Sequence, residues 1–260
     1  MKTSYKIDKV IKQLTLSAMF IVLFVILNRF ATLTIPAFGV NAFLRVGFSS
    51  IVIVMASLIL GPIYGTVIGG IGDFIGAMIF PIGAYFIGYT ISYALIGLFP
   101  GLIMFFIKKY NLKNKVFTII NISLETCLFL FVFIYILINK KIPLESTKFI
   151  ELNSNTLIII LILISIFYFI VLGLNLFFTL KEKKESPYAI PKLIFIYTII
   201  EIVCFFILNS IWGVIIMDIP FIIQILARIL KSFFTIPLLV CISKPLIEIL
   251  KKIKVIENIE

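Results

Sequence analysis

Only three of the twenty-three basic residues in this 260-residue chain are arginines, and their positions favour a binding site for an anion. Arg29 and Arg228 lie inside long apolar runs, and Arg45 lies at the start of another. Lys231 follows Arg228 by about one helical turn. A guanidinium group offers a planar pair of donors that fits a carboxylate. Because charged groups inside a membrane are costly and usually functional, these residues are predicted to hold a negatively charged ligand.

Two other interpretations of these basic residues stay open. Their side chains could extend to lipid headgroups, or they could pair with the carboxylates of Asp73 and Asp218. Asp73 lies in the segment GPIYGTVIGGIGDFIGAMIF, beside glycines that recur every three or four residues. Such a stripe of small residues lets helices pack closely in lipid. Asp73 needs a donor there, so we expect it to pair with an arginine or to accept hydrogen bonds from the N–H groups of a ligand.

Aromatic side chains gather in the segment FPIGAYFIGYTIS, where one helix is expected to end and the next to begin. They include Tyr85, Phe86 and Tyr89. An aromatic belt at the membrane surface explains them, and so does a stacking wall for a flat heterocycle with the tyrosine hydroxyls as polar handles. Trp212, which follows Asn209 near the end of another apolar run, fits either role.

The composition excludes or disfavours several chemistries. The chain has no histidine, and Cys127, Cys204 and Cys241 stand singly in different apolar runs, without metal or redox spacing. It has no GxxxxGK[ST] loop for ATP. Glu125 and Glu201 lie in different runs with no catalytic motif around either, which disfavours an intramembrane enzyme. We therefore expect no catalytic residue, no metal and no cofactor in this chain.

The apolar runs that carry these residues predict an all-α, polytopic membrane protein. Hydrophobic residues make up 62% of the chain and charged residues 13%, and the mean hydropathy is +1.22. Eight segments are long enough to cross a bilayer as helices. They span about 14–34, 44–60, 62–80, 84–107, 116–139, 155–180, 192–217 and 221–243. Gly61-Pro62 separates the second from the third. The first run is too long for a signal peptide, and we expect it to be retained.

Lysines predict the orientation of these segments. Four segments that share one side of the membrane each carry four lysines, near residues 2–12, 108–115, 181–192 and 244–254. The opposite side has three, between residues 140 and 148. Positive residues favour the cytoplasmic side, so we expect a multi-pass protein of the cell membrane with both termini in the cytoplasm. Residues 244–260 are predicted to form an amphipathic tail along the inner surface.

The segment LRVGFSSIVIVMASLILGPIYGTVIGGIGDFIGAMIFPIGAYFIGYTIS resembles the substrate-binding S components of energy-coupling factor (ECF) vitamin transporters, most closely the folate-specific type. The segments LTLSAMFIVLFVILNRF and LNSIWGVIIMDIPFIIQILARILKSFFTIPL resemble that family too. The resemblance implies a protein that takes folate from the outer side of the membrane. It also implies a transmembrane coupling protein and two ATPases as partners. Arg29, Arg45, Arg228 and Lys231 would suit the glutamate tail of folate, and Asp73 with the aromatic side chains would suit its pterin.

The family is described as having six helices, so the resemblance implies an insertion in this chain of eight. It covers residues 1–110 and 188–243, and residues 111–187 are interpreted as an inserted transmembrane hairpin. S components use two alanines four residues apart on the first helix to dock the coupling protein. The corresponding positions here are Ala18 and Val22, with Ser17 as the nearest small neighbour.

Other functions stay open on the residues alone. The protein could be an S component for another compound, such as pantothenate or a modified purine. It could also be a structural membrane protein without a transport role, although the arginines inside apolar runs would then lack an explanation.

Overall fold

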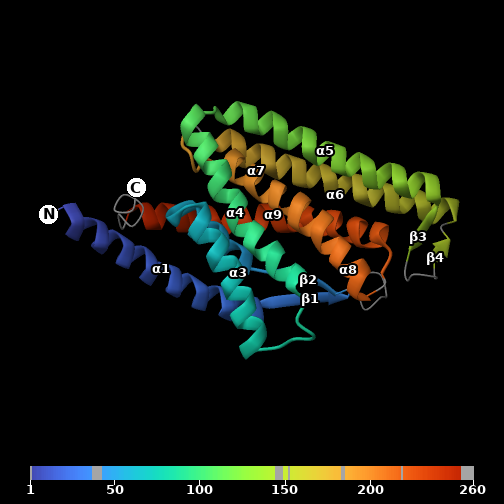
Figure 1. Cartoon of the computed structure of the whole chain (residues 1–260). Coiled ribbons are helices and arrows are strands. Elements are labelled where there is room, and N and C mark those ends of the chain that lie inside the picture. Colours follow the sequence, from blue (N-terminus) through green and yellow to red (C-terminus); the bar gives the residue numbers. More distant parts are fainter. Residues whose placement is uncertain are drawn as a thin grey trace. The chain divides into compact units, whose positions relative to one another are not determined.

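The computed structural model describes residues 2–36, 43–143, 149–151, 153–182, 185–217 and 219–252, and the side chains of 8–32, 47–140, 153–182, 185–217 and 219–250. Its helices are α1 (Lys2–Phe30), α2 (Ser49–Leu60), α3 (Pro62–Ile79), α4 (Ile87–Tyr110), α5 (Asn114–Asn139), α6 (Ser154–Lys181), α7 (Ile190–Ile200), α8 (Asn209–Met217) and α9 (Phe221–Lys252) (Figure 1). A π-helix, η1 (Glu201–Leu208), joins α7 to α8. The short strands are β1 (Thr32–Pro36), β2 (Phe43–Gly47), β3 (Lys141–Pro143) and β4 (Phe149–Glu151).

The chain divides into two compact units. Unit 1 comprises residues 1–33, 46–111 and 241–260, and unit 2 comprises residues 34–45 and 112–240. Unit 1 therefore holds α1 to α4, and unit 2 holds α5 to α8 with most of α9. Residues 188–240, which the resemblance assigns to the core of the family, fall in the same unit as the proposed insertion.

Helices α3 and α4 of unit 1 pack closely because both carry glycines where they meet. A Cβ atom added to Gly97 of α4 would meet the carbonyl oxygen of Gly65 on α3, and one added to Gly69 would meet the backbone of Tyr93. The hydroxyl of Ser57 on α2 donates a hydrogen bond to the carbonyl oxygen of Gly97. The glycine stripe therefore works as a packing surface, as the sequence predicts.

The break predicted at Gly61-Pro62 is confirmed. Helix α2 ends at Leu60 and α3 begins at Pro62, with Gly61 between them at a φ of 100°. Only glycine adopts such a backbone angle at low cost, and proline is favoured in the first turn of the helix that follows.

The prediction of a helix over 44–60 is wrong at its start. Residues 43–47 form strand β2, which pairs with β1 in a two-stranded sheet, and α2 begins only at Ser49. β-Branched and aromatic residues around residues 32–35 and 43–46 favour strands over helix. All twelve residues of α2 are buried, and at 1.5 Å per residue a helix of this length reaches about 18 Å, short of a bilayer core.

Unit 2 has a core that includes the helices of the proposed insertion. Its buried side chains come from α5 (Val132 and Ile136), α6 (Tyr168 and Val171), η1 (Phe206) and α9 (Leu226, Ile229 and Phe233). The amide of Asn121 on α5 also donates to the carbonyl oxygen of Pro191 on α7, at 2.8 Å. Helices α5 and α6 thus share one core with the helices that follow them in the chain.

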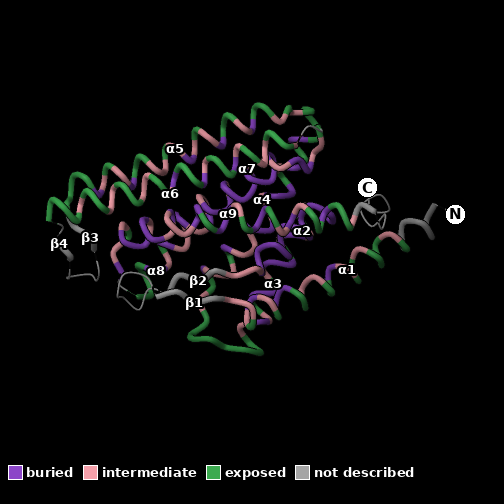
Figure 2. The backbone as a smooth tube through the Cα atoms, turned by 180° about the vertical axis from the view of Figure 1, so that it is seen from behind, coloured by how far each residue is buried: buried purple, intermediate pink, exposed green. Residues whose placement is uncertain are grey.

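Exposed apolar side chains show which solvent the helices meet. Helix α6 exposes isoleucine, leucine and phenylalanine along its length, among them Ile159, Leu163 and Phe169, and it is exposed over much of its surface (Figure 2). Seven helical segments of the described chain are long and apolar enough to cross a membrane, and α2 is the shorter eighth. A surface of this kind suits lipid rather than water. The protein is therefore a multi-pass, essentially all-α membrane protein.

The predicted amphipathic tail does not begin as a separate element after Pro245. Helix α9 continues through Pro245 to Lys252, so residues 244–252 extend the last spanning helix. The structure of residues 253–260 lies outside the described part of the chain.

Candidate ligand-binding site

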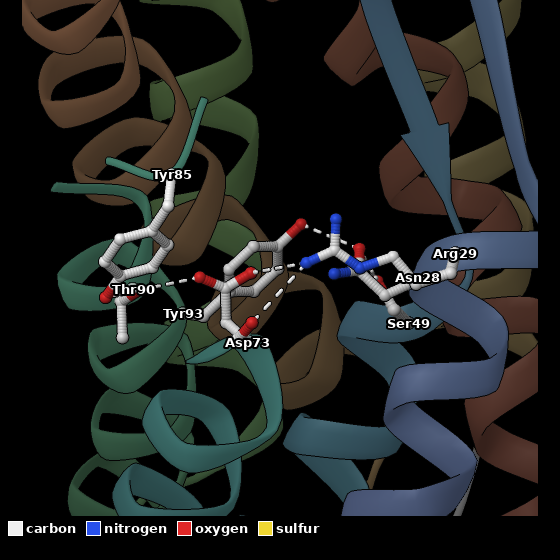
Figure 3. Close-up of polar contacts among 7 residues, drawn as sticks. All are labelled: Asn28, Arg29, Ser49, Asp73, Tyr85, Thr90 and Tyr93. Carbon is white, nitrogen blue, oxygen red and sulfur yellow. Dashed lines mark hydrogen bonds and ion pairs between the residues drawn. The ribbon is translucent and has the colours of Figure 1, made fainter. Parts of the chain in front are cut away.

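An ion pair between Arg29 and Asp73 is the centre of a polar cluster in unit 1 (Figure 3). Arg29 lies in the last turn of α1, and Asp73 lies in α3. Nη2 of Arg29 is 3.6 Å from Oδ1 of Asp73 and donates a hydrogen bond of 3.4 Å to its backbone carbonyl oxygen. Each of these side chains is only 8% exposed, so the pair is poorly screened by solvent. Asp73 was expected either to pair with an arginine or to accept hydrogen bonds from a ligand, and the structure contains the pairing with an arginine.

Residues of the α3–α4 connection and α4 hold the other carboxylate oxygen of Asp73. The hydroxyl of Thr90 donates to Oδ2 of Asp73 at 2.7 Å. The hydroxyl of Tyr85 lies 3.0 Å from that of Thr90, and it donates there because the Thr90 proton is already committed to Asp73. Tyr85, Thr90, Asp73 and Arg29 form a continuous chain of polar contacts (Figure 3). The sequence interpretation missed Thr90, although it lies one residue after Tyr89.

Asn28 forms a second branch of the cluster, next to Arg29 on α1 (Figure 3). Its side-chain oxygen accepts hydrogen bonds from the hydroxyls of Ser49 on α2, at 3.3 Å, and Tyr93 on α4, at 3.0 Å. Helices α1, α2, α3 and α4 therefore each contribute to the cluster. The sequence interpretation also missed this branch. The sequence did contain a clue to this branch, because Asn28 is a polar residue directly before Arg29 in an apolar run.

Gly76 makes room for the guanidinium group of Arg29 beside α3. A Cβ atom at position 76 would lie 3.0 Å from Nε of Arg29. That Nε atom is buried and has no hydrogen-bond partner among the described residues. Because Asp73 engages only Nη2, the guanidinium retains donors for a ligand.

The aromatic residues predicted as a wall form separate edge-to-face pairs. Phe74 and Tyr85 have ring centroids 5.7 Å apart at an interplanar angle of 80°. Phe86 and Tyr89 are 6.1 Å apart at 77°. Tyr85 is exposed, whereas Phe86 and Tyr89 are half-buried. Both the belt and the stacking interpretation remain compatible with this arrangement.

In unit 2, Arg228 lies on α9 and binds oxygen atoms at the end of the π-helix. Its Nη1 donates to the carbonyl oxygen of Phe205, and its Nη2 donates to that of Asn209, each at 3.1 Å. Nη2 also donates to the side-chain oxygen of Gln224 at 3.2 Å. A π-helix shifts the backbone out of the regular hydrogen-bond ladder and is frequently found at functional sites. Arg228 thus has a structural role that the sequence interpretation did not include.

Lys231 forms an ion pair with Glu201. From the sequence, Glu201 was considered only as a possible catalytic residue, with no motif around it. Nζ of Lys231 is 3.4 Å from Oε2 of Glu201 and 4.2 Å from the ring centroid of Phe205. The hydroxyl of Thr235 donates to Oε1 of Glu201 at 2.9 Å. The two charged side chains are 7% and 3% exposed. The negative charge that compensates the ammonium group of Lys231 on α9 therefore comes from Glu201 at the start of η1.

Four further residues named from the sequence differ in what the structure describes of them. Asn209 starts α8, and its side-chain oxygen is buried without a hydrogen-bond partner among the described residues. Trp212, three residues later, is half-buried in the same helix. The side chain of Arg45 and the whole of Asp218 lie outside the described residues.

The predicted docking residues face different sides of α1. Ala18 and Val22 are exposed, with Val22 58% exposed, and they lie one turn apart on one face. Ser17 is buried, and its hydroxyl donates to the carbonyl oxygen of Gln13 within the same helix.

Long apolar helices, with ionisable side chains packed between them, define this chain as a polytopic membrane protein. Residues 9–182 match the family described as "ECF-type riboflavin transporter, S component", and the chain belongs to this family. The predicted membership of the S components is confirmed. The matched range includes α5 and α6 and ends before α7. The proposed insertion at 111–187 therefore stays a prediction, and part of it lies within the family match.

A curated relative adds a second similarity. Over 115 residues, the chain is 30% identical to "Folate transporter FolT" from Clostridium novyi (strain NT). That match covers 42% of this chain and 63% of the relative. The chain thus spans less than two thirds of the length of the relative it matches.

Proposed function

We propose that this protein is the substrate-capture subunit of an ECF-type importer and that it binds folate from the outer side of the membrane. The observation that carries the proposal is the largely buried cluster around Arg29, Asp73, Thr90 and Asn28, to which helices α1 to α4 contribute. Similarity to a folate transporter supports folate as the ligand. Folate combines a flat, donor- and acceptor-rich pterin with two carboxylates.

Arg29 is the residue of unit 1 best suited to a ligand carboxylate. Asp73, which Thr90 holds by a hydrogen bond, fixes the position of Arg29, while Nε and Nη1 remain as donors. In unit 2, Arg228 and Lys231 are candidates for the same chemistry, and the unpaired oxygen of Asn209 is a candidate acceptor. Arg45, Tyr85, Phe86, Tyr89 and Trp212 remain candidate ligand residues by prediction.

Riboflavin is the second candidate ligand because the family carries that name. Riboflavin has a flat ring system like folate but no carboxylate. Calorimetric titration of the purified protein in detergent with folate, riboflavin and pantothenate separates the possibilities. The fluorescence of Trp212, the single tryptophan, gives an independent readout. We expect saturable binding of folate and much weaker binding of the other two compounds. Saturable binding of riboflavin alone would show that folate is wrong.

We further propose that transport needs a coupling protein and two ATPases, with Ala18 and Val22 on the docking face of α1. The exposure of both residues supports this assignment. Uptake of labelled folate in cells should require co-expression of those partners. Concentrative uptake by the isolated chain, driven by an ion gradient alone, would contradict the proposal. Replacing Val22 by glutamate should abolish uptake and leave folate binding unchanged, since a buried, unpaired charge opposes docking.

The four lysine-rich segments support an orientation with both termini in the cytoplasm of a cell-membrane protein. Reporter fusions at the two ends of the chain test it. A cytoplasm-dependent reporter should be active at both ends, and a reporter that requires export should be inactive at both.

A further inference from the structure

Asn28 is a buried amide whose two ends have different surroundings. The residue is 7% exposed, and its oxygen accepts hydrogen bonds from the hydroxyls of Ser49 and Tyr93. Its nitrogen Nδ2 makes no hydrogen bond to any residue of the described chain. Two hydroxyl donors on one oxygen fix the plane of the amide and leave its N–H groups for another partner.

A buried donor without a partner in the described chain lies on the residue next to Asn28. The next residue on α1, Arg29, has a buried Nε without a partner among the described residues. Buried donors are normally paired, and exceptions often mark functional sites or bound groups. Figure 3 shows the amide of Asn28 and the guanidinium group of Arg29 in the same cluster of polar side chains. Both side chains thus bring N–H groups, and no free acceptor, to this end of α1.

We propose that Asn28 determines ligand specificity by donating from Nδ2 to an uncharged acceptor, a carbonyl oxygen or ring nitrogen of a flat heterocycle. Asn28 adds no charge to the cluster, so its N–H groups suit an uncharged acceptor. The inference rests on the proposed function and assigns a contact for the ring. A fixed donor rejects a ligand that presents a donor at the same place, because one of the two groups is then left unpaired.

The alternative is that Asn28 only ties α1 to α2 and α4. Asn28→Asp separates the two roles because aspartate has nearly the same shape and keeps an oxygen for the hydroxyls of Ser49 and Tyr93. It replaces the N–H groups by an acceptor. The hydroxyls of Ser49 and Tyr93 keep an acceptor oxygen, whereas a donor to the ligand is lost. Asn139→Asp is the matched control, since Asn139 is exposed at the end of α5 and donates only to Tyr135 of its own helix.

The experiment titrates wild type, Asn28→Asp and Asn139→Asp with folate and with 6-methylpterin, a ring without a carboxylate. The uncharged probe removes simple repulsion between the new aspartate and the folate tail. We expect Asn28→Asp to bind both probes at least about tenfold more weakly, the loss expected for one ligand hydrogen bond, and Asn139→Asp to bind as wild type. Equal binding of 6-methylpterin by Asn28→Asp and wild type would overturn the inference.

A second variant keeps the test decisive if Asn28→Asp does not fold. Ser49→Ala with Tyr93→Phe retains Asn28 but removes the two donors that orient its amide. We expect 6-methylpterin to bind severalfold more weakly to it, and unchanged binding counts against the inference. Wild type that binds riboflavin but not folate refutes the proposed ligand alone, and lumiflavin then replaces 6-methylpterin in the same comparison. Wild type that binds none of these compounds refutes both proposals.

Discussion

Replacing Arg29 by glutamine should weaken folate binding while affecting the binding of a tail-less pterin far less. Glutamine keeps a neutral donor of similar reach but removes the charge and the planar pair of donors. A hydrogen bond that involves a charged group contributes about 1.5–3 kcal/mol, which corresponds to a loss of about ten- to a hundredfold in affinity. Arg29→Lys should recover only part of this loss, because it restores the charge without the bidentate geometry.

The same substitution also perturbs the fold, and the structure sets the size of that effect. With 3.6 Å between Nη2 of Arg29 and Oδ1 of Asp73, the Coulomb energy of the pair is about 4–5 kcal/mol at an effective dielectric constant of about 20. Much of it offsets the desolvation of the two charges, but removing one partner leaves the other buried and unpaired, at a cost of about 3–5 kcal/mol. Arg29→Gln alone is therefore expected to lower the melting temperature.

The double variant Arg29→Gln with Asp73→Asn separates binding from stability. It removes both charges, so we expect a melting temperature closer to wild type than that of Arg29→Gln. Its affinity for folate should stay low because the guanidinium is still missing. Calorimetric titration of wild type and both variants with folate and 6-methylpterin gives the comparison. The decisive quantity is the ratio of the two affinities, which should fall by about tenfold or more in both variants.

Two outcomes would refute the role of Arg29. If the folded variants bind folate and 6-methylpterin in the same ratio as wild type, Arg29 does not contact the tail. If both ligands weaken equally in Arg29→Gln and recover in the double variant, the effect of Arg29 is purely structural.

Three other predictions concern substitutions at Arg228, Lys231 and Gly76. Arg228→Gln should destabilise the protein by about 2–4 kcal/mol, because partly buried carbonyl oxygens at the end of the π-helix lose their donors, and thermal unfolding should show it whether or not ligand is present. Lys231→Met should lower the melting temperature more than the double variant that adds Glu201→Gln, since the single change leaves a buried carboxylate unpaired; equal melting temperatures would contradict the ion pair. Gly76→Ala should weaken folate binding more than 6-methylpterin binding, because the new Cβ presses on Nε of Arg29; an unchanged affinity ratio would show that the guanidinium moves without consequence.

The proposed insertion makes a fifth prediction, and the structure adds an expected effect on stability. Deleting residues 113–186 and joining the flanks should leave ligand binding intact if α5 and α6 are peripheral to the site. However, both helices share a core with η1 and α9, and Asn121 bonds to the backbone of α7. We therefore expect the shortened protein to bind folate but to unfold at a lower temperature. A folded deletion variant without any affinity would place these helices in the site.

The sequence by itself determined the features that depend on neighbours along the chain. Apolar runs of bilayer length predicted the spanning helices, because the lipid requires backbone hydrogen bonds to close within each segment. The pair Gly61-Pro62 predicted a helix boundary through local backbone geometry alone. The rare arginines and Asp73 indicated a polar site because a charge inside an apolar run cannot be solvated or paired by its neighbours along the chain.

The tertiary structure decided which of these groups meet, because partners on different helices depend on how the helices are rotated and spaced. Nothing in the spacing of the sequence indicates that Gly76 opens a place for Arg29 or that Thr90 and Tyr85 complete the surroundings of Asp73. Lys231 was expected to need a compensating charge, but only the π-helix and the packing of α9 identified it as Glu201. Strand β2 stands where the start of a helix was predicted. Its pairing with β1 satisfies backbone hydrogen-bonding groups, and this pairing depends on another segment that a local sequence pattern does not include.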